Sequence, residues 1–184
     1  MGGDLGRALN AGPVEGLTLD QWHQRYQQQA RWTADVRNYL IKKASLHPGG
    51  RVLEVGVGTG AVLNAITEER SIHPFGVDLN RLSLNYARGI HSAFCLIQAD
   101  GVRLPFPAGK FDLAYCHYLL LWAADPSHIL QEMGRVTQPG GVVIALAEPD
   151  HESRIDYPPP LDHLGKLQTK ALAEQGVDTS LGRR

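Results

Sequence analysis

The stretch Arg51-Val52-Leu53-Glu54-Val55-Gly56-Val57-Gly58-Thr59-Gly60 decides the fold of this chain. Its first half is an apolar run with one charged residue, Glu54, and predicts a short buried strand of a parallel sheet. Glycine then occupies every second position, and an apolar helical pattern follows over residues 61–66. The glycines therefore form a strand-to-helix turn, where they adopt positive φ without strain and let a ligand approach the backbone. Such a turn predicts a nucleotide-like ligand at the carboxyl end of the first strand.

The spacing of the glycines separates two classes of ligand. Dinucleotide-binding folds carry G-x-G-x-x-G, with the pyrophosphate at the helix N-terminus, whereas Gly56, Gly58 and Gly60 follow G-x-G-x-G. Glu54 stands just before them, where a carboxylate would repel a phosphate and attract an ammonium group. The stretch resembles the first motif, E/D-x-G-x-G-x-G, of the class I S-adenosylmethionine-dependent methyltransferases, whose cofactor carries a sulfonium and an amino group and no phosphate. A glycine-rich turn without a ligand is the alternative.

The next two expected strands, residues 73–79 and 93–100, both reach an acid at their ends. Asp78 follows Gly56 by 22 residues, which fits the offset of about 20 residues for the acid that binds a ribose diol. Its two carboxylate oxygens can accept from both hydroxyls. Capping of the next helix is the alternative role for Asp78. For Asp100, the resemblance implies that the acid accepts from the exocyclic amino group of adenine.

Two more features follow the pattern of that family, and a helix is expected between them. Residues 111–117 are expected as the fourth strand and resemble its F-D-x-V motif. A helix is expected from Asp125-Pro126, because proline is favoured at the first helical position. Residues 138–141 resemble the family's P-G-G closure, and residues 142–146 are expected as the fifth strand. The alternation predicts an α/β, Rossmann-like, doubly wound parallel sheet of about five strands. The resemblance spans about residues 35–150 and is closest to small-molecule, type 11-like members.

Two helices are expected before the first strand. Asp20 is a candidate cap for the first one, in which Trp22 and Tyr26 lie at helical spacing. In similar methyltransferases such helices cover the cofactor and shape the acceptor pocket, and the alternative is that these aromatic residues are simply core. The second helix, over residues 33–45, is expected to present one apolar face made of Val36, Tyr39, Leu40 and Ala44.

The chain divides into four expected parts: a mobile arm (1–17), an N-terminal helical cap (18–50), the cofactor-binding core (51–150) and a C-terminal helical extension (151–184). The two further strands that family members usually add are missing from the pattern, so the chain resembles a member shortened at its C-terminus. The fifth strand is then an apolar edge without a blocking charge. We expect it to pair with a second copy in a homodimer; cover by the extension or by the arm is the alternative.

The composition of the chain limits the classes of partner and the cellular location that we expect. The chain has 18 basic and 19 acidic residues and no basic block, so no nucleic-acid partner is expected. No apolar run is long enough to span a bilayer, and the N-terminus lacks the pattern of a signal peptide. Cys95 and Cys116 are expected to be buried, reduced thiols in a cytoplasmic protein, and no metal-site spacing is present.

The resemblance implies S-adenosylmethionine as cofactor, S-adenosylhomocysteine as product, and a small-molecule methyl acceptor. The cofactor-binding residues that it implies are Glu54, Gly56, Gly58, Gly60, Asp78, Leu79, Asp100, Gly101, Cys116 and His117.

Methyl transfer is an in-line displacement at an activated carbon, so the protein mainly holds donor and acceptor in place. No residue must be catalytic. His117 and Tyr118 follow the fourth strand and are candidates to face the methyl group, with His117 as a base near neutral pH; simple packing is the alternative. His151 is a weaker candidate. A non-catalytic cofactor-binding or interaction module is the rival function. A nicotinamide-dependent oxidoreductase is disfavoured by the glycine spacing and by Asp100.

Overall fold

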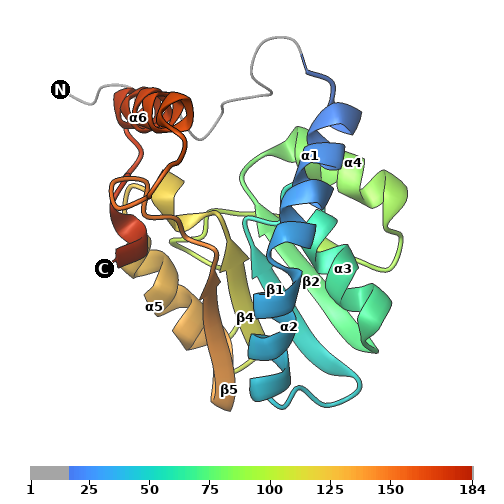
Figure 1. Ribbon diagram of the computed structural model, residues 1–184. Coiled ribbons are helices and arrows are strands. Elements are labelled where there is room, and N and C mark those ends of the chain that lie inside the picture. Colours follow the sequence, from blue (N-terminus) through green and yellow to red (C-terminus); the bar gives the residue numbers. More distant parts are fainter. Residues whose placement is uncertain (1–16, 184) are drawn as a thin grey trace, which may run out of the picture.

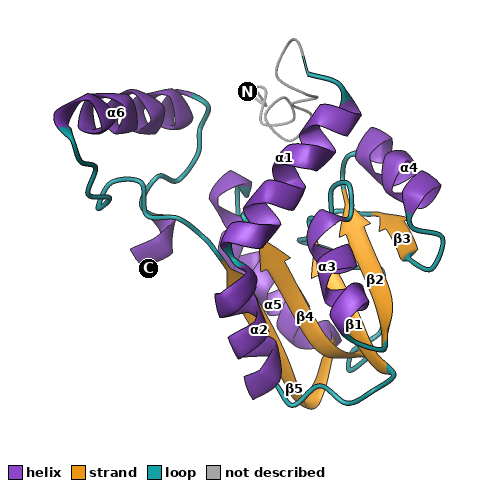
Figure 2. Cartoon of the chain, turned by 45° about the vertical axis from the view of Figure 1, so that its right-hand side comes forward, coloured by secondary structure: helices purple, strands orange, loops and turns teal. Residues whose placement is uncertain are grey.

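Five parallel strands form a single sheet with the order β3-β2-β1-β4-β5 (Figures 1 and 2). The computed structural model describes residues 17–183, so nearly all of the expected N-terminal arm lies outside the described residues. The predicted Rossmann-like α/β sheet is confirmed. Its strands are β1 (Gly50–Val55), β2 (Ile72–Asp78), β3 (Cys95–Gln98), β4 (Phe111–His117) and β5 (Thr137–Leu146).

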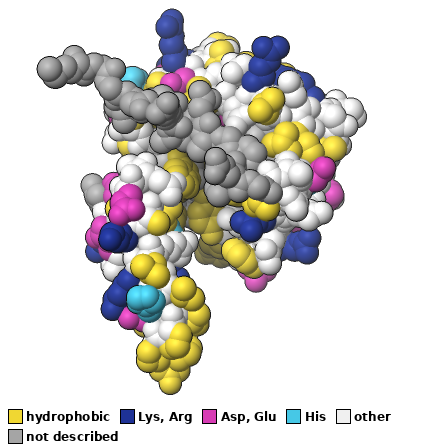
Figure 3. Space-filling view, turned by 90° about the horizontal axis from the view of Figure 1, so that it is seen from above, with side chains coloured by type: hydrophobic (Ala, Val, Ile, Leu, Met, Phe, Trp, Pro, Cys, Tyr) yellow, Lys and Arg dark blue, Asp and Glu magenta, His cyan; other side chains and the backbone are white. Residues whose placement is uncertain are grey.

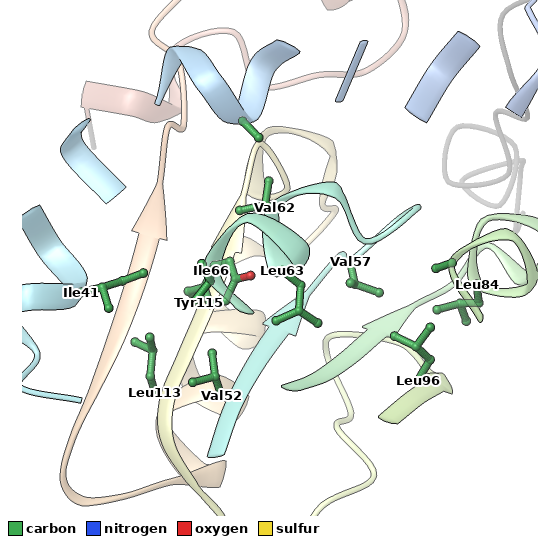
Figure 4. Close-up of a cluster of buried hydrophobic side chains, with 12 residues drawn as sticks. Ile41, Val52, Val57, Val62, Leu63, Ile66, Leu84, Leu96, Leu113 and Tyr115 are labelled. Carbon is green, nitrogen blue, oxygen red and sulfur yellow. The ribbon is translucent and has the colours of Figure 1, made fainter. Parts of the chain in front are cut away.

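Helices cover both faces of this sheet and divide the core into two clusters. Successive side chains of a strand point to opposite faces, so Val52 joins one cluster and Leu53 the other. The first cluster, drawn in Figure 4, packs α1–α4 against the sheet, and the second packs α5. The helices are α1 (Leu19–Trp32), α2 (Ala34–Lys43), α3 (Ala61–Glu69), α4 (Arg81–Ile90) and α5 (Pro126–Val136).

Helix α1 begins two residues earlier than a cap at Asp20 would allow. Thr18 is the N-cap: its hydroxyl accepts from the Gln21 backbone N–H, and the Gln21 side chain accepts from the Thr18 N–H in return. This reciprocal pair satisfies two backbone donors, one more than a single cap would. Asp20 instead accepts a hydrogen bond from the Tyr86 hydroxyl at 2.8 Å, so the predicted cap was wrong.

The buried face of α2 also differs from the predicted one. Val36 and Tyr39 are 48% and 59% exposed, whereas Arg37 and Ile41 are buried. Arg37 turns inward because its guanidinium donates to the backbone carbonyl of Ala30, near the end of α1, at 2.6 Å. A carbonyl in the last turn of a helix has no partner within the helix, and this hydrogen bond supplies one.

After β5 the chain forms an arm, residues 153–178, that contains helix α6 (Pro159–Glu174) and projects from the body (Figure 2). Its two ends are fastened together: the His151 N–H donates to the Thr179 carbonyl at 2.8 Å, and Arg183 pairs with Asp150 at 3.3 Å. Hydrophobic side chains gather on the projecting lobe in Figure 3. The exposed apolar residues of the arm are Ile155, Tyr157, Leu161, Leu164 and Leu167.

Both sheet edges are partly open. β3 forms one edge, which leaves Cys95 exposed rather than buried as predicted. β5 forms the other edge, as predicted, and Val143 is 37% exposed there. Within residues 17–183, no helix has the length and apolar character needed to cross a membrane.

We expect the mean mass of the protein in light scattering to rise from that of one chain toward that of two as the concentration increases. The reason is that the unpaired backbone groups of β5 are available to a second copy. Val143→Lys will keep the protein monomeric, because a charge on an edge strand opposes pairing. Cys95→Lys places the same charge on the opposite edge and will leave the association unchanged. A constant monomer mass at every concentration would contradict the homodimer.

Candidate functional site

The glycine turn after β1 has the geometry that its sequence predicts. The φ angles of Gly56, Gly58 and Gly60 are 77°, 50° and 81°. Residues other than glycine rarely adopt such positive φ angles. A Cβ atom on Gly56 would lie 2.8 Å from the Leu119 side chain, and one on Gly60 would lie 3.0 Å from His91. A Cβ atom on Gly58 would meet no atom within 4 Å. The turn is therefore open at Gly58, where a ligand can approach the backbone.

Asp78 lies directly against this opening. Its Oδ2 accepts from the Gly58 N–H at 2.7 Å and its Oδ1 accepts from the Asn80 N–H at 2.8 Å. Burial raises the pKa of Asp78, and the hydrogen bonds from the Asn80 and Gly58 N–H groups oppose that rise. Asn80 itself caps α4 by accepting from two backbone N–H groups. Capping by Asp78 is thus unnecessary, and both carboxylate oxygens keep lone pairs for a ligand.

The residues expected on the adenine side lie at the same edge of the sheet. β2 and β3 pair in register from Phe75 to Asp78, so their carboxyl ends are adjacent. The Leu79 carbonyl accepts from the Gln98 side chain at 2.9 Å. Asp100 is exposed and accepts from the Val102 N–H at 3.1 Å. Gly101 packs closely over β1, where an added Cβ would lie 3.1 Å from Val55. Adenine binding by Leu79, Asp100 and Gly101 stays a prediction.

Glu54 reaches into the first core cluster beside the first turn of α3, where it accepts a hydrogen bond from the Leu63 N–H. It is buried, and its Oε2 accepts from the Tyr115 hydroxyl at 2.8 Å. Burial raises the pKa of Glu54 to about 8, although the hydrogen bonds from Tyr115 and from the Leu63 N–H act in the opposite direction. The carboxyl group is therefore mostly protonated at pH 7, and the expected attraction of a carboxylate for an ammonium group is weak there. Direct contact of Glu54 with the cofactor stays a prediction.

The end of β4 places Cys116 and His117 on opposite faces of the sheet. Cys116 lies in the α5 cluster, 3.8 Å from a carboxylate oxygen of Glu148. The Nε2 atom of His117 lies 3.0 Å from the Thr33 hydroxyl, and burial together with the positive charge of Arg37 lowers the pKa of His117 to about 4. The imidazole is thus neutral at pH 7 and is a weaker base than we expected.

Tyr118 continues the chain at a positive φ of 52°, and its ring meets the His117 ring edge-on at 4.6 Å. Burial and the nearby Glu148 raise the pKa of Tyr118. His151 lies at the base of the α6 arm, where its backbone N–H donates to the Thr179 carbonyl. Burial together with the positive charge of Arg154 lowers the pKa of His151. A catalytic role for any of these side chains stays a prediction.

Helix α1 supplies contacts that the sequence did not reveal. His23 Nδ1 lies 2.9 Å from the hydroxyl of Thr59 inside the glycine turn. Tyr26 lies near Asp78, whose charge adds to burial in raising the pKa of Tyr26. α1 therefore lies against the glycine turn. That it covers the cofactor and shapes the acceptor pocket, as the resemblance implies, stays a prediction. No local signal predicts these contacts, because they depend on the path of α1 over α3.

Glu148 is a second residue that the sequence analysis missed. It follows β5, and its Oε1 accepts from the N–H groups of Leu119 and Leu120 at 2.9 and 3.0 Å. These bonds hold the turn after β4 beside the glycine turn. The signal was available, since Glu148 is an acid within two residues of the end of a strand, as Asp78 and Asp100 are.

Residues 53–145, half of the chain, match the model of a protein family described as "Methyltransferase domain". The chain belongs to this methyltransferase family. The matched residues run from β1 to β5 and so contain the glycine turn and the strands that form the candidate site.

Known proteins agree with this assignment to the methyltransferase family. The malonyl-[acyl-carrier protein] O-methyltransferase of Serratia marcescens is 31% identical, over 65% of this chain and 46% of that protein. The protein of the same name from Erwinia billingiae is 30% identical, over 86% of this chain and 66% of its own length. The chain thus spans about half to two thirds of these relatives. A structure described as a putative methyltransferase from Anabaena variabilis superposes with a TM-score of 0.64 at 18% identity, over 77% of this chain and 55% of that one, which shows the shared fold.

Proposed function

We propose that this methyltransferase domain binds S-adenosylmethionine and passes its methyl group in line to a small molecule, leaving S-adenosylhomocysteine. The observation that carries the proposal is the pair formed by Gly58 and Asp78: a backbone N–H and a carboxylate, 2.7 Å apart, beside the one glycine of the turn at which a Cβ would meet open space. A carboxylate suits a ribose diol, whereas a phosphate would be repelled.

The residues present fit this cofactor. When bound, the cofactor supplies a methyl group already activated by a sulfonium, so the chain needs no nucleophile of its own. Gly58 leaves room for close approach of the ligand, and Asp78 accepts from the ribose hydroxyls. α1 lies against the turn through the contact of His23 with Thr59. Holding donor and acceptor at reacting distance accounts for most of the rate in such a displacement.

Relatives named as methyltransferases of small or carrier-bound molecules support a small-molecule acceptor. Besides the malonyl-[acyl-carrier protein] enzymes, one of them is a ubiquinone/menaquinone biosynthesis C-methyltransferase of Vibrio vulnificus, 33% identical over 60% of this chain and 45% of that protein. Their acceptors differ, so the acceptor of this chain is proposed only as a class. A non-catalytic cofactor-binding module remains the rival, and the cytoplasmic location stays a prediction.

Calorimetric titration with S-adenosylhomocysteine and, separately, with NADH tests the cofactor. We expect saturable binding of the first and none of the second, since the turn lacks the spacing for a pyrophosphate. Transfer of a labelled methyl group from S-adenosylmethionine to a panel of small hydroxyl, amine and quinol compounds then separates an enzyme from a binding module. Binding of NADH alone would overturn the proposal.

Gly58→Ala will weaken S-adenosylhomocysteine binding by about tenfold, equivalent to about 1.4 kcal/mol, because the new methyl group occupies the space at the turn. Since φ is 50° there, the variant will also lose about 1–2 kcal/mol of unfolding free energy. Gly89→Ala is the control: an added Cβ in α4 meets no atom within 4 Å and φ is not positive. Calorimetry checks the affinities, and unchanged binding by Gly58→Ala would show that Gly58 does not line the site.

A further inference from the structure

The junction between α1 and α2 reaches the end of β4 through a single buried threonine. Thr33, the residue between the two helices, is 7% exposed, and its Oγ1 lies 3.0 Å from Nε2 of His117. Side chains alternate along a strand, so His117 projects to the same face as Tyr115, the face that α1–α3 cover. The Nε2 side of the imidazole is thus held by Thr33, between α1 and α2.

The direction of this hydrogen bond follows from the other partners of Thr33. A threonine hydroxyl has one hydrogen to donate, and Thr33 Oγ1 lies 3.3 Å from the carbonyl oxygens of Gln29 and Ala30. Carbonyl oxygens only accept, and two of them lie within reach of this one hydrogen, so we infer that the hydroxyl hydrogen points to one of them rather than to His117. The oxygen of Thr33 is then the acceptor for His117, and Nε2 of His117 carries the hydrogen.

The second ring nitrogen of His117 is left with a lone pair. Within residues 17–183, Nδ1 has no hydrogen-bond partner, and it is not among the polar atoms sealed from solvent without one. The guanidinium of Arg37, buried beside the ring on α2, disfavours a second positive charge there, and the Tyr118 ring packs on the other side. A neutral imidazole with an accessible Nδ1 is a hydrogen-bond acceptor.

We propose that Thr33 is a positioning residue that holds His117 in the Nε2–H tautomer, so that Nδ1 accepts a hydrogen bond from the methyl acceptor. This inference rests on the proposed methyltransferase function. It assigns an acceptor whose methylated atom is an oxygen or nitrogen that carries hydrogen. With that hydrogen held by Nδ1, the lone pair of the acceptor atom is turned toward the methyl group, which is the orientation that in-line transfer requires. Transfer breaks the bond between the sulfonium sulfur and the methyl carbon and forms the bond from that carbon to the acceptor atom; the electron pair of the broken bond stays on sulfur in S-adenosylhomocysteine, and the acceptor then loses its proton to water. His117 only orients the acceptor and takes no proton.

The tautomer is measured by ¹⁵N NMR of the histidine rings in the full chain at pH 7, with His117→Asn to assign the signals. We expect Nε2–H in the wild-type protein and in Thr33→Ser, which keeps the hydroxyl. In Thr33→Val the Nε2–H group would face a methyl group without an acceptor, so we expect the hydrogen to move to Nδ1. An Nδ1–H or doubly protonated ring in the wild type, or an unchanged tautomer in Thr33→Val, would overturn the inference.

The acceptor role is tested in protein saturated with S-adenosylhomocysteine and titrated with ethanol, ethylamine and phenol. A change in the Nδ1 shift with any of these donors, absent with anisole and reduced in Thr33→Val, supports the inference. No change with any of them contradicts it. Failure of the wild type to bind S-adenosylhomocysteine contradicts the proposed function instead, so the two failures are distinguishable.

Discussion

Asp78→Ala will bind S-adenosylhomocysteine about 10- to 150-fold more weakly than the wild-type protein, as measured by calorimetry. Asp78 lies at the mouth of the glycine turn, where its carboxylate already accepts from the Gly58 N–H. Hydrogen bonds from the ribose hydroxyls to this carboxylate are charge-assisted and are worth about 1.5–3 kcal/mol in total. Each 1.4 kcal/mol corresponds to about a tenfold change in affinity, which gives the range.

Two variants make this result specific. Asp78→Asn keeps the size and one oxygen acceptor but removes the charge, so its affinity will lie between those of the wild type and the alanine variant. Asp125→Ala removes an acid that caps α5, where its side chain accepts from the His128 N–H. It will lose about 1 kcal/mol of unfolding free energy and no affinity. Equal affinities of wild type and Asp78→Ala would reject Asp78 as the ribose ligand.

The free energy of unfolding of the wild-type protein will fall as the pH rises from 6.5 to 8. The pKa of Glu54 is about 8 in the folded protein against 4.5 for an ordinary glutamate, so the folded state holds this proton more tightly. The resulting stabilisation is complete below pH 4.5 and is lost through pH 8, at about 1.4 kcal/mol per pH unit. The folded protein therefore becomes less stable as the pH rises above 6.5.

His117 works in the opposite direction at lower pH. Its pKa is about 4 in the folded protein against 6.5 otherwise, so its contribution is lost as the pH falls from 6.5 toward 4. Between pH 4.5 and 6.5 the loss of the Glu54 contribution with rising pH is nearly balanced by the gain of the His117 contribution, so the free energy of unfolding changes little. Above 6.5 only that of Glu54 remains, and we expect a net decline of about 2 kcal/mol by pH 8.

Glu54→Gln isolates the contribution of Glu54. Glutamine keeps an oxygen acceptor for the Tyr115 hydroxyl and cannot ionise, so the decline above pH 6.5 will disappear. Urea unfolding at several pH values measures both proteins. His117→Asn is the matched control, because it removes the acidic limb and keeps the alkaline one. A parallel decline in wild type and Glu54→Gln would show that another group is responsible.

Features that neighbouring residues determine were predictable from the sequence. The glycine turn, Asp78 at the end of β2 and the start of α5 at Asp125-Pro126 are examples, because each depends on a few consecutive residues. The acids at the ends of parallel strands fall at one edge of the sheet by topology alone. This is why the fold and the position of the site followed from the pattern.

Features that depend on how one element lies against another were not predictable. The contacts of Thr33 with His117 and of His23 with Thr59 join residues 84 and 36 positions apart. Arg37 is buried because a helix end needs a donor, which overrides the apolar pattern of α2. Cys95 is exposed because β3 is an edge strand, and the order of strands is a property of the whole sheet.

The α6 arm leaves and rejoins the body at one place, through the pairing of His151 with Thr179 and of Arg183 with Asp150. Because its ends already meet, exchanging the residues between them changes the closure entropy of the chain only slightly with length. The arm is therefore a segment that can be exchanged without moving its two ends. Segments of different length and chemistry can replace residues 153–178 while the five strands and the glycine turn stay as they are.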